Sequence, residues 1–530
     1  MNPFFRHSCS LILLCLLVAL TIAVTCSNRA DIFIAGRVYF IDADCYSRMT
    51  RVRMVLEHPT TIIRHHEFEN YPQGTTPHTT LPFDYLIAAL KKILDAGFWI
   101  CGGESSPWAS QTLDLAGAFV SPMLGVITMI FLWLWSLRLQ LACRGMMLFL
   151  YAVSPIIVHG TILGRPDHQS LVMLLMAVAL GAEWGIAKTD SRKWAILGGV
   201  AWGLGLWVTL YEPLVLLAAV VALNMTFGFR RFFSRGRALE YGLAFGILAL
   251  SLVIEGWRVD LSDPLIARFF QNWEKTIGEL TTLSLFSPVF FGWVGLLFAA
   301  APVLLILGIR SDRRMIPLLL FVASLWALTV WQMRWGYFFA LVFAMSIPFQ
   351  MNVIRWRSVA WTLFILSLWP VAAEWDGRLF PEGEARVRMM EEREDKVLLR
   401  DAAECLKSDK MLPVLAPWWF SPALAYWSGQ PAIGGSSHES LSGIVDSARF
   451  YLETEPGAAC KILRGRKVLR VVVYDTGRVL ETSSTLLGEQ APAMPMARIL
   501  YERPHSLPDF FRLEYANNSF KVFSIALKEQ

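Results

Sequence analysis

The chain has 530 residues, of which 55% are hydrophobic and 13% aromatic, and its mean hydropathy is +0.46. This composition excludes an ordinary soluble domain and is typical of an integral membrane protein. The net charge is +5, but the basic residues concentrate in short loops between apolar runs, so the charge gives no support for nucleic-acid binding.

About eleven apolar runs are long enough to cross the roughly 30 Å of hydrocarbon in a bilayer as helices. They lie near residues 8–27, 112–137, 144–162, 169–187, 194–211, 213–229, 238–257, 288–309, 315–333, 336–353 and 358–374. The first run could instead be a cleaved signal peptide, because Arg6 precedes it and small residues close it near Thr25–Ser27. The sequence therefore predicts a polytopic α-helical protein of the plasma (inner) membrane, with about eleven or more spans.

Basic residues in the short loops give the orientation of these spans. When the spans are counted alternately, the basic loops all fall on the side of the N-terminus: Arg138, Arg144, Lys188, Arg192, Lys193, Arg230, Arg231, Arg235, Arg237, Arg310, Arg313, Arg314, Arg355 and Arg357. The positive-inside rule makes this side cytoplasmic. The other, extracytoplasmic side then receives residues 28–111, a turn at 163–168, a loop at 258–287 and the tail.

The sequence predicts two domains, a transmembrane domain over residues 1–375 and a soluble extracytoplasmic domain over 376–530. In the tail, alternating charges at Glu391–Lys396 indicate an exposed helix face. Three short apolar runs predict strands, at Leu412–Leu415, Val468–Tyr474 and Phe511–Tyr515. We therefore expect an α/β fold for the tail.

Acidic and imidazole groups occur in the predicted outer segments. Asp42 and Asp44 follow the first span, and two carboxylates at this spacing can hold a divalent cation through hard oxygen ligands. Asp44 could instead cap the helix that follows it. His78 comes after the turn Tyr71–Gly74 and could bind a metal or a phosphate through its ring, although a lone external histidine is more often ordinary surface.

The turn Gly164–Gln169 places Arg165, Asp167 and His168 between two spans. Charged groups at a membrane boundary are costly unless they pair with one another or bind something. The alternative is a helix cap beside an interfacial arginine. We favour a functional role, because charged groups at such positions usually serve one.

Three more polar or aromatic positions complete the set. Glu279 ends the segment Thr276–Glu279 in a long loop and, taken alone, could be a solvated carboxylate. Arg334 lies at the outer end of a span, where its planar guanidinium could bind phosphate or simply extend to the interface. Trp418 and Trp419 follow a predicted strand, and paired tryptophans are often core residues.

Taken in order and on one side of the membrane, these pieces resemble the GT-C oligosaccharyltransferases, which include single-subunit bacterial and archaeal enzymes and the catalytic subunit of the eukaryotic complex. The resemblance covers most of the chain. The segments that carry it are Asp44–Tyr46, Tyr71–Gly74, His78 with Pro82–Asp84, Gly164–Gln169, Thr276–Glu279, Arg334 and Trp418–Trp419.

The resemblance implies a role for each of these residues. Those implied as catalytic are Asp44, Asp167 and Glu279. The implied ligands of a divalent cation, Mg²⁺ or Mn²⁺, are Asp44, Asp167, His168, Gln169 and His78. Arg334 and Arg165 would bind the donor phosphate, and Glu279, Trp418 and Trp419 would bind the acceptor.

Two positions depart from the family pattern. Gln169 stands where the family usually has His, Asp or Glu, and a neutral amide is a weaker metal ligand. Phe420 stands where the family has the Asp of Trp-Trp-Asp, which binds the hydroxyl of a Ser or Thr two places after the acceptor Asn. Phenylalanine cannot accept that hydrogen bond.

The implied function is metal-dependent, inverting transfer of a glycan from a polyprenyl (pyro)phosphate donor to an acceptor at the extracytoplasmic face, most simply protein glycosylation. A first alternative is a GT-C enzyme that moves a single sugar from a polyprenyl monophosphate to a lipid or glycan, which Phe420 favours. A second is a transporter of lipid-linked sugar, which would need charges near mid-bilayer, whereas Glu212 and Glu255 fall at span ends. A third is an inactive scaffold.

Overall fold

The computed structural model describes residues 3–78, 81–232, 234–257, 264–310, 312 and 315–526. The chain forms two compact units, each assembled from three separate stretches. The helical unit contains Met1–Ala30, Gly117–Ile254 and Thr281–Gly383. The mixed unit contains Asp31–Ala116, Glu255–Leu280 and Glu384–Gln530.

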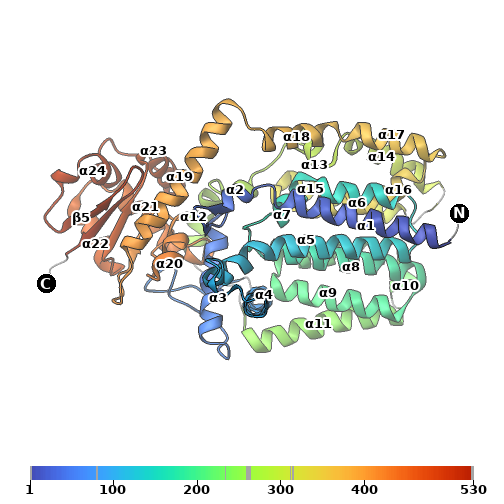
Figure 1. The fold of residues 1–530 in the computed structure, drawn as a ribbon, viewed down its shortest axis with the longest axis horizontal. Coiled ribbons are helices and arrows are strands. Elements are labelled where there is room, and N and C mark those ends of the chain that lie inside the picture. The colour runs from blue at the N-terminus through green and yellow to red at the C-terminus, as the bar shows by residue number, and fades with distance from the viewer. Residues whose placement is uncertain are drawn as a thin grey trace. The chain divides into compact units, whose positions relative to one another are not determined.

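The helical unit is a bundle, drawn in Figure 1. Its helices are α1 (Pro3–Thr25), α5 (Thr112–Arg138), α6 (Arg144–Val153), α7 (Pro155–Thr161), α8 (Gln169–Thr189), α9 (Arg192–Val208), α10 (Tyr211–Phe232), α11 (Arg235–Glu255), α13 (Pro288–Val294), α14 (Leu297–Ile309), α15 (Met315–Trp331), α16 (Gly336–Met351), α17 (Arg357–Ser367) and α18 (Trp369–Leu379). Helix α16 is apolar all round and almost entirely buried, as expected for the central helix of a bundle, and it packs against α6 and α15.

Four helices in the described part of the chain are long and apolar enough to cross a membrane, or up to five if the pair α13–α14, bent by 72°, is one span. Several predicted runs are broken or shorter. The run at 144–162 is divided into α6 and α7 at Ser154–Pro155, because proline has no N–H to donate and begins a new helix. The helical architecture is confirmed, and the count of about eleven spans stays a prediction.

The mixed unit contains a four-stranded sheet in the order β3-β4-β6-β5, in which β3 runs parallel to β4 and the other pairs are antiparallel. Its strands are β3 (Val414–Leu415), β4 (Arg470–Val473), β5 (Phe511–Ala516) and β6 (Lys521–Ile525). The predicted α/β character of the tail and its three predicted strands are confirmed. Strand β6 was not anticipated.

Helices complete the mixed unit: α3 (Ala43–Glu57), α4 (Leu81–Ile100), α12 (Pro264–Glu274), α19 (Gly383–Cys405), α20 (Ser421–Ser428), α21 (Leu441–Leu452), α22 (Pro456–Gly465), α23 (Thr476–Leu487) and α24 (Met496–Glu502). Helix α12 presents Phe269 and Trp273 to a small apolar core that also contains Leu441 and Val445 of α21.

The stretch before α4 is tied to the tail by backbone and side-chain hydrogen bonds. Tyr71 N donates to Ala432 O at 3.2 Å. Arg466 donates to Oδ1 of Asn70 at 3.0 Å and to Oδ2 of Asp446 at 2.8 Å. Segments far apart in the sequence therefore form one packed body inside the mixed unit.

Candidate active site

The turn between α7 and α8 is held by hydrogen bonds to helices α1 and α5. Leu163 N donates to Thr25 O at 2.9 Å, and Gly164 N donates to Ala118 O at 3.0 Å. Gly164 has a φ of +76°, which glycine adopts without the steric penalty of a side chain. The backbone that carries the next five residues is therefore fixed within the helical unit.

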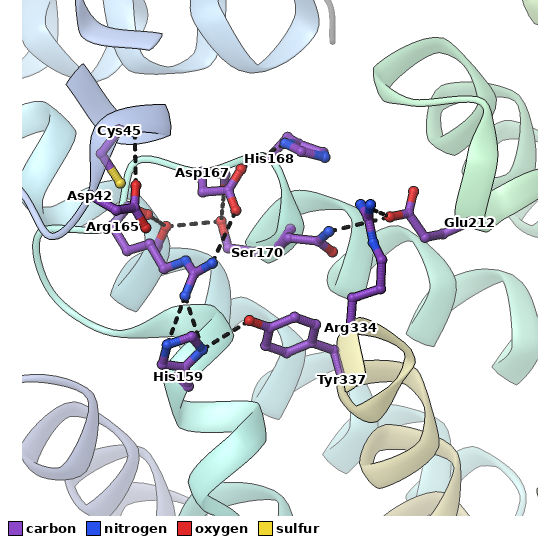
Figure 2. A network of polar contacts seen from close by, with 12 residues as sticks. Asp42, Cys45, His159, Arg165, Asp167, His168, Ser170, Glu212, Arg334 and Tyr337 are labelled. Carbon is purple, nitrogen blue, oxygen red and sulfur yellow. Dashed lines mark hydrogen bonds and ion pairs between the residues drawn. The ribbon is translucent and has the colours of Figure 1, made fainter. Parts of the chain in front are cut away.

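Asp167 is held between a basic and an imidazole side chain, as Figure 2 shows. Its Oδ1 lies 2.6 Å from His168 Nδ1, and its Oδ2 lies 3.5 Å from Arg165 Nη2. Asp167 and Arg165 are only 7% and 5% exposed. The three charged or titratable groups of the turn therefore satisfy one another, as expected for groups at a membrane boundary.

Arg165 also contacts two residues that the sequence analysis did not identify. Its Nη1 lies 2.9 Å from Nδ1 of His159, and the hydroxyl of Tyr337 lies 2.8 Å from the same ring nitrogen (Figure 2). The rings of His159 and Tyr337 are stacked, 6.0 Å apart at 8°. Both residues sit in apolar runs with no local signal of a site, and together they fix the direction of the Arg165 guanidinium.

A second buried pair lies at the start of α10. Arg334, in the short helix η4 (Met333–Trp335), donates from Nη2 to Oε1 of Glu212, which is fully buried. Gln169 and Thr209 also donate to the Glu212 carboxylate, each at 3.4 Å. Figure 2 shows Glu212 and Arg334 facing one another. From the sequence, Glu212 was recognised only as a residue at a span end. The local signal there was that of a helix start, with Thr209 before Glu212 and Pro213 after it.

The helical unit has atoms that suit a divalent cation. His168 Nε2 and Gln169 Oε1 are buried and have no hydrogen-bond partner in the described chain. Together with Asp167 they offer an imidazole nitrogen, an amide oxygen and a carboxylate oxygen. Divalent cations bind all three kinds of atom. Gln169 therefore remains a usable ligand through its carbonyl oxygen, although it lacks charge.

In the mixed unit, Asp42 and not Asp44 caps α3. Asp42 has extended backbone, with φ −144° and ψ 177°, and its Oδ1 accepts a hydrogen bond from Cys45 N at 3.0 Å. Asp44 lies in the first turn and is exposed. The alternative in which Asp44 is the cap is wrong, because the residue that precedes the first helical residue is Asp42. Capping therefore does not occupy the Asp44 carboxylate.

The segment after His78 has a structural partner on α3. Asp84 Oδ1 accepts from Arg48 Nη1 at 2.7 Å, and Asp84 Oδ2 lies 3.4 Å from Arg51 Nε. Asp84 and Arg48 are 2% and 4% exposed. This buried cluster joins α4 to α3, and it fixes the helix whose first turn carries Asp44.

The tryptophan motif lines a small pocket in the mixed unit. Trp418 and Trp419 face residues of α21 and α23 across it, among them Ile444, Ser447 and Val479. The indole nitrogens of Trp418 and Trp419 have no hydrogen-bond partner in the described chain. The pocket is therefore mainly apolar, with unsatisfied polar atoms on residues that line it.

Phe420 points into an aromatic cluster. Its ring centroid lies 4.9 Å from that of Tyr474 and 5.3 Å from that of Phe520, both in edge-on contacts. Phe420, at the position where the resemblance implies an aspartate, is therefore a packing residue. Helix α20 follows directly and packs on α3, where the ring centroids of Tyr46 and Trp427 lie 4.8 Å apart.

The remaining predicted residue, Glu279, lies half-buried in the short helix η3 (Gly278–Leu280) of the mixed unit. The turn before it is closed by Thr276, whose Oγ1 donates to Trp273 O at 2.6 Å. The predicted residues thus divide by unit. Those in the helical unit are Arg165, Asp167, His168, Gln169 and Arg334, and those in the mixed unit are Asp44, His78, Glu279, Trp418 and Trp419.

No family model matches the chain. Over 208 residues it is 29% identical to dolichyl-phosphooligosaccharide-protein glycotransferase 2 of Archaeoglobus fulgidus, a match that covers 38% of this chain and 32% of that protein. The chain thus matches about a third of the length of this curated relative.

Solved structures match over far more of the chain. A crystal structure of the oligosaccharyltransferase of A. fulgidus in complex with zinc and sulfate gives a TM-score of 0.69 at 15% identity, over 95% of this chain and 78% of that chain. The chain has the GT-C glycosyltransferase fold. A second GT-C structure, ArnT of Cupriavidus metallidurans bound to undecaprenyl phosphate, gives a TM-score of 0.55 at 11% identity, over 96% of this chain and 97% of that chain.

The resemblance predicted from the motifs is therefore confirmed at the level of the GT-C fold. The oligosaccharyltransferase scores higher than ArnT, whereas ArnT matches this chain more closely in length. Both structures match at least 95% of this chain, so fold alone does not separate the two types of GT-C enzyme.

Proposed function

We propose that this chain is a membrane glycosyltransferase of the oligosaccharyltransferase type, which transfers a glycan from a polyprenyl (pyro)phosphate to a protein acceptor. The observation that carries the proposal is the buried polar cluster around Asp167 and Arg165, with Glu212 and Arg334 beside it, in a bundle of the GT-C fold. Buried charges of both signs in an apolar bundle are costly, and they are typical of a site for a charged ligand.

Two arginines are suited to the donor's phosphate. Arg165 and Arg334 present planar guanidinium groups whose directions are set by His159 and Glu212. A guanidinium binds phosphate oxygens with two parallel hydrogen bonds, and holding it in place beforehand reduces the entropy lost on binding. The undecaprenyl phosphate bound by ArnT is a ligand of the same class as the proposed donor.

A divalent cation, Mg²⁺ or Mn²⁺, fits the donor atoms available. In the helical unit Asp167 would hold it, with His168 and Gln169 as further ligands. The resemblance also implies Asp44 and His78 as ligands. When bound, the cation would neutralise negative charge on the departing phosphate. The zinc in the related oligosaccharyltransferase structure supports a divalent ion in this class of protein.

The proposed reaction inverts the configuration of the sugar. The acceptor nitrogen attacks C1 of the sugar from the face opposite the phosphate, and the bond from C1 to the phosphate oxygen breaks with its electron pair going to that oxygen. The acceptor proton passes to a carboxylate, for which Asp44 and Glu279 are the candidates. Glu279 and the pair Trp418–Trp419 would orient the acceptor.

The proposed topology places the reaction on the extracytoplasmic face of the plasma membrane. It is supported by the basic loops, which fall on one side when the predicted spans are counted. The soluble domain predicted over residues 376–530 would then lie outside, together with the protein acceptor, while the polyprenyl tail would remain in the bilayer.

A second candidate is a GT-C transferase that moves a single sugar from a polyprenyl monophosphate to a lipid or glycan. Phe420 favours it, because the ring packs against Tyr474 and Phe520 and offers no acceptor for a sequon hydroxyl. The near-complete length match with ArnT favours it as well.

Purified chain supplied with either donor separates the two candidates. Transfer of an oligosaccharide from a polyprenyl pyrophosphate to an Asn-containing peptide supports the proposed function, and transfer only from a polyprenyl monophosphate to a lipid supports the second candidate. In cells, mass spectrometry of extracytoplasmic proteins with and without the gene should show Asn-linked glycopeptides only when the gene is present. Failure of Asp167→Ala to abolish either transfer would overturn both.

A further inference from the structure

The mixed unit contains two histidines and a glutamate that face one another. His78 lies at the end of the 71–78 segment, and His438 and Glu439 begin the short helix η5 (His438–Ser440), some 360 residues later in the chain. One ligand atom from each of the three residues lies within 4.8 Å of the others. The three groups are thus brought together by the fold and not by the local sequence.

Glu439 is the centre of this cluster. Its Oε1 accepts a hydrogen bond from His78 N at 2.8 Å, and it also lies 2.5 Å from His78 Nδ1. Its Oε2 lies 3.5 Å from His438 Nδ1 and is buried without a hydrogen-bond partner in the described chain. The two imidazole rings lie 5.0 Å apart. Glu439 therefore offers one carboxylate oxygen to each ring.

We propose that His78, His438 and Glu439 form a binding site in the mixed unit for a transition-metal ion, most simply Zn²⁺, in addition to the ion proposed at Asp167. Two imidazoles and one carboxylate are a ligand set that zinc takes in protein sites where a fourth position remains for water or another ligand. Mg²⁺ prefers oxygen ligands, so this set selects against it.

The geometry requires only small side-chain movements. A tetrahedral zinc ion about 2.0 Å from each ligand separates the ligand atoms by about 3.3 Å. The present separations are at most 4.8 Å, and the side chains of His78 and His438 are 34% and 24% exposed, so their rings have room to turn. The same exposure gives an ion a route to the site.

The charge of the cluster also suits a cation. Glu439 brings a carboxylate, which binds metal as the anion, and the two histidines bind it as neutral imidazoles. The site takes His78 out of the ligands proposed for the catalytic ion, and it does not depend on the proposed function.

Zinc binding by the full-length chain in detergent tests the site, with Asp167→Ala introduced to remove the proposed catalytic ion. We expect about one zinc ion per chain by elemental mass spectrometry, and visible absorption from Co²⁺ bound in its place. His438→Ala and Glu439→Gln should each weaken zinc binding at least about tenfold. His505→Ala, which removes an exposed histidine of the same unit, should leave it unchanged.

Thermal unfolding of each variant without zinc shows whether it is folded. Glu439→Gln is a conservative change, because glutamine has the same size as the glutamate that it replaces. Added zinc should raise the melting temperature of the Asp167→Ala protein and not that of the same protein carrying His438→Ala. A folded Asp167→Ala protein that binds no zinc, or whose binding survives His438→Ala, would overturn the site. Neither measurement needs a donor or an acceptor, so a failure of the proposed glycosyl transfer would be seen separately.

Discussion

The guanidinium of Arg334 donates a hydrogen bond to the carboxylate of Glu212, whose side chain is fully buried in the helical unit. An arginine carries five N–H donors in a rigid plane, so one bond to a fixed carboxylate sets the direction of the others. The residue expected to meet the donor phosphate is thus oriented by a glutamate for which no role was expected.

Glu212→Gln should lower the free energy of unfolding by about 3 kcal/mol, because it leaves a partly buried guanidinium without its counter-charge. Thermal unfolding in detergent measures this, and the double variant with Arg334→Gln should cost less than the sum of the two single changes. The control is Glu374→Gln, which breaks an exposed pair with Arg378 and should cost no more than about 1 kcal/mol. If Glu212→Gln and Glu374→Gln lowered the free energy of unfolding equally, the pair between Arg334 and Glu212 would not be a buried, oriented one.

Asp167→Asn should reduce the rate of glycan transfer by at least about a hundredfold, because the amide removes the charge that Arg165 and His168 surround. The measurement is the initial rate with a lipid-linked donor. Asp190→Asn serves as the matched control, since Asp190 is the C-cap of α8, the helix that follows Asp167, and its Oδ1 accepts a hydrogen bond from Ser234 at 3.1 Å. Comparable rates for the Asp167 variant and the parent would remove Asp167 from the active site.

The stability of the mixed unit should fall in mild acid because of His66. Burial, with help from Arg51 and His65, lowers the pKa of His66 from 6.5 to about 3, and the residue is only 6% exposed. Since the unfolded chain takes up this proton below pH 6.5 and the folded chain does not, the contribution is fully present above pH 6.5 and is lost progressively towards pH 3.

At pH 5 the loss amounts to at most about 2 kcal/mol. Unfolding measured at pH 7 and pH 5 should show a smaller difference for His66→Gln than for the parent. His505→Gln, at an exposed position, should behave like the parent. An unchanged pH dependence in His66→Gln would show that His66 has the same pKa in the folded and the unfolded chain.

Peptide acceptors should show little need for a hydroxyl two residues after the acceptor Asn. In sites built to bind a substrate hydroxyl, kcat/KM falls by about ten-thousandfold or more for analogues that lack it. Phe420, however, is packed against Tyr474 and Phe520 and cannot accept a hydrogen bond. We expect kcat/KM for Asn-X-Thr and Asn-X-Ala peptides to differ by less than about tenfold. A preference above a thousandfold would mean that another group reads the hydroxyl.

The sequence predicted the parts of the site that follow from local rules. Arg165, Asp167 and His168 were expected either to pair with one another or to bind something, because a membrane boundary penalises single charges, and the structure shows them paired. Their functional role stays a prediction. The identity of the α3 cap was not predictable, because Asp42 and Asp44 are equally good capping residues and only the backbone angles decide between them.

Local rules do not predict contacts between residues that are far apart in the sequence. Tyr337 meets His159 across 178 residues of sequence, and Glu439 meets His78 across 361. No periodicity or spacing links positions so far apart, and each residue alone has an ordinary explanation. The strand at β6 was missed for a related reason, since its five residues gain their order from pairing with β4 and β5.

The contact between Asn70 and Arg466 joins positions 396 residues apart within the mixed unit. At a synthesis rate of about 5–20 residues per second, the ribosome needs roughly 20 to 80 seconds to make the second partner after the first. Until Ala432 is made, the early segment has none of its native partners in the tail and is open to proteases and to mispairing. A nonsense mutation before codon 432 should therefore leave this early segment unfolded, although every one of its own residues has been translated.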